Sequence, residues 1–254
     1  MNTRLHWQTH GQGPDVVLLH GWGMNGAVWE KTAQQLALRY TVHVVDLPGY
    51  GHSANLDAAS MDEIVELLIQ HGPAQAVWVG WSLGGLIASQ LAFAYPERVR
   101  KLITVASSPK FAADLPWRGI KPQVLSAFTE QLTEDFDKTI ERFMALQAMG
   151  SPTARQDVKA LKQAVLSRPK PNASALQLGL GFLAQVDLRE RLSTLSQPVL
   201  RLYGRLDGLV PVKVAADMQK LLPNSEQHIF AQSSHAPFIT EADEFNKLLV
   251  TFIG

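Results

Sequence analysis

Apolar residues follow two alternating patterns along the first 106 residues of the chain. Residues 16–19 form a short, fully apolar run, which is typical of a parallel strand covered on both faces, and further strands are expected at 42–45, 76–79 and 99–106. Between them, at residues 27–38, 61–71 and 83–95, apolar residues recur at the spacing of a helix. Strands that alternate with helices in this way predict a doubly wound, mostly parallel sheet.

The alternation stops after residue 110. From residue 121 to residue 149 the apolar positions keep a helical spacing with no strand between them, and Gly150 is expected to end that helix. Ser151 and Pro152 are suited to start a second helix, which runs to about residue 166. A third helical stretch covers 176–185.

The strand pattern returns at residues 199–203 and 227–231. We therefore expect an α/β core made of residues 1–110 and 188–254. Residues 111–187 are expected to form an inserted helical cap that lies over the carboxyl edge of the sheet.

One serine stands between two glycines at the end of an expected strand. Residues 80–84 read Gly-Trp-Ser-Leu-Gly, with an apolar run before them and a helical pattern after them. On so sharp a strand-to-helix turn the serine has a strained backbone, and the residues two positions away come so close that only glycine fits. The turn lifts the hydroxyl clear of the sheet, so we expect Ser82 to be a nucleophile. A glycine-rich turn with an incidental serine is the alternative.

A serine hydroxyl becomes a good nucleophile when a histidine takes its proton and a carboxylate orients that histidine. In this kind of sheet the acid and then the histidine follow later strands. Asp207 follows the strand expected at 199–203, and His235 follows the one at 227–231. Ligands of open α/β sheets bind at this carboxyl edge, so we predict a catalytic triad of Ser82, Asp207 and His235.

Other acids and histidines fit the triad less well. Asp187 is expected to cap a helix, Asp217 lies in a helical pattern, and His228 lies inside the last strand. His20 and His52 lie in loops at the same edge but precede the serine, as is typical of structural, hydrogen-bonding histidines.

Acyl transfer also requires donors for an oxyanion. The residue after the nucleophile supplies one backbone N–H, and the loop after an early strand supplies the other. We expect these donors to be the amides of Leu83 and Trp22. The Trp22 indole either lines the acyl site or only packs in the core.

Composition and charge exclude several classes of function. The 254 residues carry 23 basic and 23 acidic side chains, so no net charge draws the chain to nucleic acid or to an anionic membrane. The chain contains no cysteine, which excludes disulfides and thiolate catalysis. It also shows no metal-binding motif, phosphate loop or dinucleotide fingerprint, so we expect no metal and no cofactor.

The sequence contains no run of about 18 apolar residues, the length that suggests a membrane span. The first ten residues lack the apolar segment of a secretion signal. We therefore expect a cytoplasmic protein, and we take it to be a monomer.

Together these motifs resemble the α/β-hydrolase family over essentially the whole chain. The matching segments are residues 20–23, 46–53 and 80–84, the Asp207 loop and the His235 loop. The resemblance implies the α/β-hydrolase fold and serine hydrolase chemistry.

A narrower resemblance includes the cap. Residues 104–109, 143–150, 155–157 and 206–211 look like the pimeloyl-ACP methyl ester carboxylesterases of biotin synthesis. These enzymes remove a methyl group from the far end of a pimeloyl chain attached to acyl carrier protein, so the resemblance implies that substrate and that partner. A general short-chain carboxylesterase, an acyltransferase and a non-catalytic binding member of the fold remain alternatives.

The resemblance also implies two sets of binding residues. The substrate would contact Trp22, Ser82, Leu83, Phe143, Met144, Ala145, Leu146, Gln147 and His235. Acyl carrier protein would contact two basic i,i+4 pairs, which are Lys138 with Arg142 and Arg155 with Lys159.

Each set also has a structural interpretation. Without the resemblance, the apolar cap residues are ordinary cap packing. The basic pairs are then solvated helix faces paired with Glu134, Asp135 and Glu141. Lys138 and Lys159 stand where arginines are expected, which keeps the charge but loses the planar guanidinium.

Overall fold

A computed structural model describes residues 4–254, except for the side chains of Thr133, Phe136 and Asp137. The prediction that the N-terminal segment carries no secretion signal therefore lies partly outside the described residues. The strands are β1 Trp7–His10, β2 Asp15–Leu19, β3 Thr41–Val45, β4 Ala76–Trp81, β5 Val99–Val105, β6 Val199–Gly204 and β7 Glu226–Phe230. The helices of the two faces are α1 Glu30–Leu36, α2 Met61–His71, α3 Leu83–Ala94, α8 Lys213–Leu221, α9 Pro237–Thr240 and α10 Ala242–Ile253.

Within the described residues, the seven strands form one sheet in the order β1-β3-β2-β4-β5-β6-β7. β1 pairs antiparallel with β3, and all other pairs are parallel. The chain moves outward from β2 to β3 and returns with β4 on the other side of β2. The carboxyl ends of β2 and β4 therefore flank a switch point, the place where open α/β sheets bind ligands. The doubly wound, mostly parallel sheet is confirmed.

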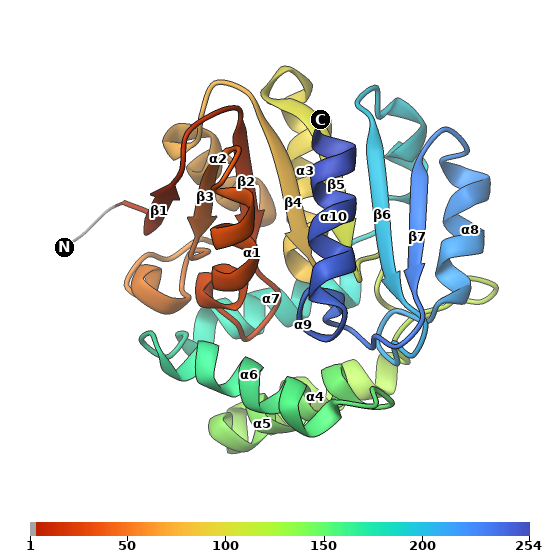
Figure 1. The fold of residues 1–254 in the computed structure, drawn as a ribbon. Helices are drawn as coiled ribbons and strands as arrows, with labels where there is room; N and C mark the ends of the chain where they lie inside the picture. Colours follow the sequence, from red (N-terminus) through yellow and green to blue (C-terminus); the bar gives the residue numbers. More distant parts are fainter. Residues whose placement is uncertain (1–3) are drawn as a thin grey trace.

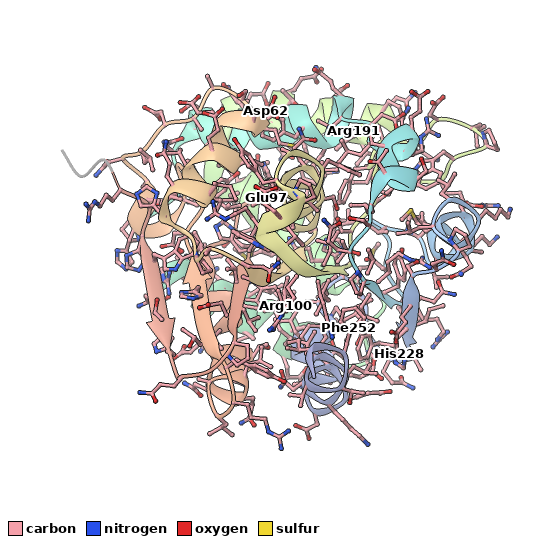
Figure 2. The ribbon with its side chains drawn as sticks, turned by 90° about the horizontal axis from the view of Figure 1, so that it is seen from above. Asp62, Glu97, Arg100, Arg191, His228 and Phe252 are labelled. Atoms are coloured by element: carbon pink, nitrogen blue, oxygen red, sulfur yellow. The ribbon has the colours of Figure 1, made fainter. Side chains whose placement is uncertain are left out.

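Helices cover both faces of the sheet. α1 and α10 pack together on one face, and α2 and α3 pack together on the other (Figure 1). Seen along the sheet in Figure 2, Asp62 of α2 and Phe252 of α10 lie on opposite sides of it. Since both faces are covered, every residue of β4 and β6 is buried, including Arg201 of β6, which donates to the side chains of Ser225 and Gln219.

Four helices occupy the described chain between β5 and β6 and lie across the carboxyl ends of the strands (Figure 1). They are α4 Pro122–Glu134, α5 Phe136–Ala148, α6 Ala154–Leu166 and α7 Ala173–Gln185. α5 packs against α4 and α6, while α7 packs against α4 and α3. The division into a core and a cap at residues 111–187 stays a prediction.

The prediction of one helix over residues 121–149 is wrong, because the chain breaks at Asp135. This residue has an extended backbone, with φ −149° and ψ 93°, and its side chain accepts the N–H of Lys138 at 3.1 Å. Aspartate is well suited to cap a helix in this way, and the cap competes with continuation of the preceding helix. Two helices of the same apolar spacing result.

Smaller differences concern the ends of the core. The helix expected at 27–38 begins as a 3₁₀ turn at Gly26–Trp29, capped by Asn25, and continues as α1. β1, α9 and α10 were not predicted, although α10 buries Phe245, Leu249 and Ile253 at helical spacing. In residues 4–254, the structure shows no helix with the length and apolarity needed to span a membrane.

Candidate active site

Ser82 lies on the sharp turn that joins β4 to α3. Its φ of 55° and ψ of −117° are outside the usual regions for a residue with a side chain. A Cβ added at Gly80 would lie 2.2 Å from the Gly84 oxygen, and one at Gly84 would lie 2.6 Å from the His20 oxygen. Both positions therefore require glycine, as the sequence pattern predicts.

The structure brings the three predicted triad residues together. The Ser82 Oγ lies 2.8 Å from His235 Nε2, and His235 Nδ1 lies 2.7 Å from Asp207 Oδ2. The other oxygen of Asp207 accepts the backbone N–H groups of Leu209 and Val210 at 2.8 and 2.9 Å. These bonds fix the carboxylate, which in turn orients the imidazole toward the serine.

The triad is covered by protein. Ser82 is 3% exposed, Asp207 6% and His235 1%. In such a water-poor site, the attraction between the carboxylate and a protonated imidazole is stronger than it would be in water.

The backbone of His235 is held at both of its polar groups. Its carbonyl oxygen accepts the indole N–H of Trp81 at 2.7 Å, and its N–H donates to the carbonyl of Gln147 at 3.0 Å. Trp81 belongs to the strand that carries Ser82, while Gln147 belongs to α5. Neither role was predicted. The role of Trp81 had one sequence signal: a tryptophan in an apolar strand is buried, and a buried indole N–H requires an acceptor.

The two predicted oxyanion donors flank the serine. Leu83 is the first residue of α3, and the loop that carries Trp22 comes so close that a Cβ added at Gly21 would lie 3.2 Å from Ser82 Cβ. In the described part of the chain, neither the Trp22 nor the Leu83 amide donates a hydrogen bond. Both amides are thus available to an oxyanion.

The Trp22 indole contacts two of the helices above the sheet. It is fully buried, its N–H donates to the Leu176 oxygen of α7 at 2.8 Å, and it meets the Phe143 ring of α5 edge-on at 4.7 Å. The structure therefore joins two of the predicted substrate contacts, Trp22 and Phe143.

The other predicted substrate contacts on α5 differ in exposure. Met144 and Gln147 are buried and Leu146 is half-buried, whereas Ala145 is exposed on the outer side of the helix. The Gln147 Oε1 is buried and has no hydrogen-bond partner among the described residues. A buried amide oxygen without a donor is costly, so this atom is suited to meet a polar group of a ligand.

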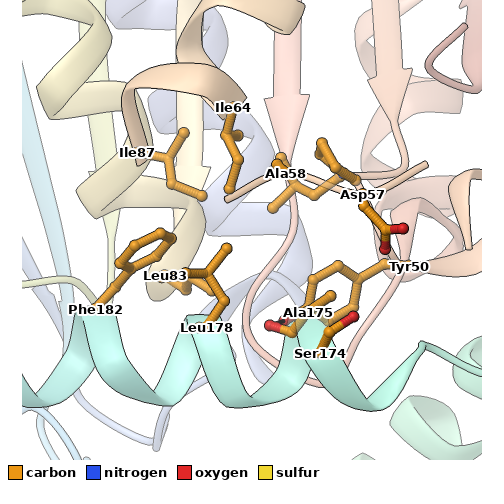
Figure 3. Close-up of a pocket in the computed structure, with 13 residues that line it drawn as sticks. Tyr50, Asp57, Ala58, Ile64, Leu83, Ile87, Ser174, Ala175, Leu178 and Phe182 are labelled. Atoms are coloured by element: carbon orange, nitrogen blue, oxygen red, sulfur yellow. Dashed lines mark hydrogen bonds between the residues drawn. The ribbon is translucent and has the colours of Figure 1, made fainter. Parts of the chain in front are cut away.

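A narrow pocket lies next to Leu83 (Figure 3). α7 contributes Leu178 and Phe182 to its wall, and Ile64 and Ile87 face them from α2 and α3. Its volume of about 10 Å³ is room for one water molecule. It does not accommodate an acyl chain in this structure.

The predicted basic pairs are exposed on α5 and α6. Lys138 lies 2.9 Å from Asp135, so one of the three acids in the structural interpretation does pair with a predicted basic residue. Arg142 donates to the Gln131 side chain at 3.0 Å and lies over the Phe128 ring. Arg155 and Lys159 make no ion pair within the described residues.

The competing acids have other partners. Asp187 pairs with Arg189 at 2.7 Å, which holds the pKa of its carboxyl at about 2, and it also pairs with Lys110. Asp217 lies in α8 and pairs with Arg118 at 2.6 Å. None of these contacts reaches the triad.

The competing histidines also have structural partners. His228 lies within β7, 3.2 Å from Glu244. His20 is fully buried, and its Nε2 accepts the Leu47 N–H at 3.0 Å. Burial lowers the pKa of His20 to about 4, so it is neutral near pH 7. These hydrogen bonds identify His20 as a structural residue.

Within residues 4–254, no group of three or more His, Cys, Asp or Glu side chains is arranged to hold a metal.

A buried ion pair that was not predicted ties the helices above the sheet to the core. Asp46 follows β3 and is fully buried, and its Oδ1 accepts from Arg168 at 2.7 Å and from the Gly26 N–H at 2.7 Å. Arg168 comes from the turn after α6. No local sequence pattern connects residues 122 positions apart.

The fold and the triad define a class of serine hydrolases. A family model described as alpha/beta hydrolase fold matches residues 14–242, and the chain belongs to this family. A solved esterase structure from Exiguobacterium antarcticum has the same fold, with a TM-score of 0.87, 23% identity, and coverage of 98% of this chain and 95% of that one.

Closer similarity is found among curated relatives. A Vibrio vulnificus (strain CMCP6) protein named pimeloyl-[acyl-carrier protein] methyl ester esterase is 67% identical over 254 residues, covering 100% of both chains. A Vibrio cholerae protein of the same name is 64% identical over 252 residues, covering 99% of both chains. The similarity therefore includes the helices above the sheet as well as the core.

Proposed function

We propose that the protein is a serine carboxylesterase of biotin synthesis. It hydrolyses the methyl ester of a pimeloyl chain carried by acyl carrier protein, and it releases methanol. The observation that carries this proposal is the buried Ser82–His235–Asp207 array. The full-length similarity to esterases named for that substrate supports the choice of ester.

The geometry gives each residue a step. As Ser82 Oγ attacks the ester carbonyl, His235 Nε2, 2.8 Å away, takes its proton, and Asp207 stabilises the imidazolium. The Trp22 and Leu83 amides bind the oxyanion, where loss of one donor typically costs about 10²–10³ in rate. His235 then returns the proton to the departing methanol. Water, activated by the same histidine, cleaves the acyl-enzyme.

Residues 111–187 act as a cap that binds the acyl chain. Phe143, Met144, Leu146 and Gln147 offer a mostly apolar surface on α5, and the contact between Phe143 and Trp22 supports a role for this surface next to the proposed oxyanion donors. A methylene chain gains about 0.8 kcal/mol for each CH₂ that it buries there. Ala145 faces away from this surface.

The exposed basic pairs form the docking patch for the carrier, which we define as Lys138, Arg142, Arg155 and Lys159. A basic patch on a chain without net charge attracts an acidic partner and sets its orientation. Arg155 and Lys159 support this role best, because no carboxylate of the described residues neutralises them. The cytoplasmic location and the monomeric state remain predictions.

Replacement of the nucleophile tests the chemistry. Ser82→Ala should abolish turnover of both a carrier-linked and a small methyl ester, measured as methanol release. Activity near the wild-type level would exclude Ser82 as the nucleophile.

Charge reversal tests the carrier. Arg142→Glu combined with Arg155→Glu should raise KM for the carrier-linked ester and leave the small ester unaffected. Arg39→Glu with Lys247→Glu is the matched control, because it reverses two exposed charges outside the patch, one just before β3 at the amino end of the sheet and one on α10. An equal loss on both substrates in the patch variant would argue against docking and would favour a general carboxylesterase.

A further inference from the structure

Three segments meet behind the catalytic histidine. They are the end of α5, the loop that carries Asp207 and the loop that carries His235. The Ser234 hydroxyl lies where they meet, 3.0 Å from the Met149 oxygen and 3.4 Å from the Leu206 oxygen. Ser234 is 1% exposed, so its single proton has only protein acceptors in reach.

Backbone bonds reinforce the same junction. The N–H of His235 donates to the Gln147 carbonyl at 3.0 Å, and the N–H of Leu206 donates to the Ser233 carbonyl at 3.0 Å. Successive residues of the histidine loop are thus bonded either to the end of α5 or to the residue that precedes Asp207. Within this set, the hydroxyl of Ser234 is the side-chain group that reaches both segments.

A second set of buried hydrogen bonds holds the segment that follows α5. Asp157 of α6 is 4% exposed, and its Oδ2 accepts from Ser151 at 2.7 Å and from Thr240 at 3.0 Å. Thr240 ends α9, five residues after the catalytic histidine. The turn between α5 and α6 is therefore attached to the chain on both sides of His235.

We propose that Ser234 is a positioning residue for the triad. Its hydroxyl bonds the end of α5 to the histidine loop. The packing of α5 on the core and the correct position of His235 therefore depend on each other. The imidazole must satisfy Ser82 at 2.8 Å and Asp207 at 2.7 Å at the same time, and a small displacement of its backbone lengthens one of these bonds. This inference rests on the proposed ester hydrolysis at Ser82, but not on the identity of the acyl chain.

Ser234→Ala tests the proposal, with Ser233→Ala as the matched control. Ser233 is the neighbouring residue and is fully buried, but its hydroxyl donates to Glu241 of the core and does not contact the cap. With p-nitrophenyl acetate as a small substrate, Ser234→Ala should lower kcat about tenfold and change KM less than twofold. Ser233→Ala should keep kcat within about twofold of the wild type.

A spectroscopic signature separates positioning from general destabilisation. The far-downfield proton resonance of the His235–Asp207 hydrogen bond should broaden or shift in folded Ser234→Ala and stay unchanged in Ser233→Ala. If Ser234→Ala does not fold, Ser234→Cys is measured instead, because it keeps a weaker donor in similar volume.

Two results would overturn the proposal: equal kcat values for the two alanine variants, or a resonance in Ser234→Ala identical to that of the wild type. Failure of the proposed substrate is distinguishable from both. In that case the wild type hydrolyses the small ester but not the carrier-linked one, and the comparison of Ser234 with Ser233 still applies.

Discussion

Gly179 of α7 lies against Trp22 and Leu83, whose amides we propose as the oxyanion donors, and Gly179→Ala tests how tightly α7 holds these two residues. A Cβ there would lie 2.7 Å from Trp22 Cδ1, 3.0 Å from the Tyr50 hydroxyl and 3.2 Å from Leu83 Cδ2. All three side chains are buried, and the indole is also bonded to Leu176, so none of them can turn away freely. Overpacking of this kind costs about 1–3 kcal/mol.

The same helix supplies a control. A Cβ added at Gly181 would meet nothing within 4 Å, so Gly181→Ala should gain the helix preference of alanine, about 1 kcal/mol. Gly179→Ala gains the same helix preference, but the clash costs about 1–3 kcal/mol. Its net loss of folding stability is therefore about 0–2 kcal/mol. For a chain of this size, about 1 kcal/mol shifts Tm by about 2–4 °C.

The two variants should separate more clearly in activity than in stability. A displaced Trp22 or Leu83 moves an oxyanion donor, and a misplacement of about 1 Å can cost about 10²-fold in rate. We expect kcat on a small ester to fall at least about tenfold in Gly179→Ala and to stay unchanged in Gly181→Ala. Equal activity in the two variants, with the same rise in Tm, would refute the reasoning.

Three further substitutions test other parts of the structure. Trp81→Phe removes the donor to the His235 carbonyl, so urea unfolding should show a loss of about 1–3 kcal/mol together with a lower kcat; no change in either would contradict the role. Arg168→Met leaves the buried Asp46 carboxylate without its cation and should cost about 3–5 kcal/mol, whereas a loss below about 1 kcal/mol would show that the pair is unimportant. The third substitution is His20→Gln. Unfolded His20 binds a proton below about pH 6.5, whereas the buried imidazole, with its pKa lowered to about 4, stays neutral. Between pH 7 and pH 4 the wild type should therefore lose about 3 kcal/mol more stability than His20→Gln, and equal losses would contradict this.

The core sheet and the triad could be predicted because their signals are local. β2 and β4 are apolar runs, and Ser82 directly follows β4. Asp207 and His235 lie in the loops that follow β6 and β7, although β7 itself is mostly polar. Parallel strands bring their carboxyl ends to one edge, so the chain order alone predicts that these residues meet.

The long-range hydrogen bonds and the ion pair around the triad could not be predicted in the same way. The bond from Trp81 to the His235 carbonyl joins residues 154 positions apart, and the bond from Arg168 to Asp46 joins residues 122 apart. Such pairs depend on how loops pack in three dimensions, which neither periodicity nor a short motif specifies. The Ser234 hydroxyl belongs to this group, since both of its acceptors are carbonyls of other loops.

In the helices above the sheet, the spacing of apolar residues did not predict where one helix ends and the next begins. The apolar spacing continues across Asp135, yet the chain breaks there because the aspartate caps the next helix. The same helix places Phe143 inside and Ala145 outside, a distinction that a contiguous range of predicted contacts ignores. Helical geometry applied residue by residue would have separated the two.

The central claim is that Ser82 cleaves a carrier-linked methyl ester with water as the final acceptor. A single turnover of pimeloyl-ACP methyl ester by excess enzyme in heavy-oxygen water measures this directly. We predict one methanol per carrier, with the heavy oxygen in the new terminal carboxylate, and no reaction with Ser82→Ala. A carrier-linked ester that keeps its methyl group while a short-chain ester is hydrolysed would contradict the claim.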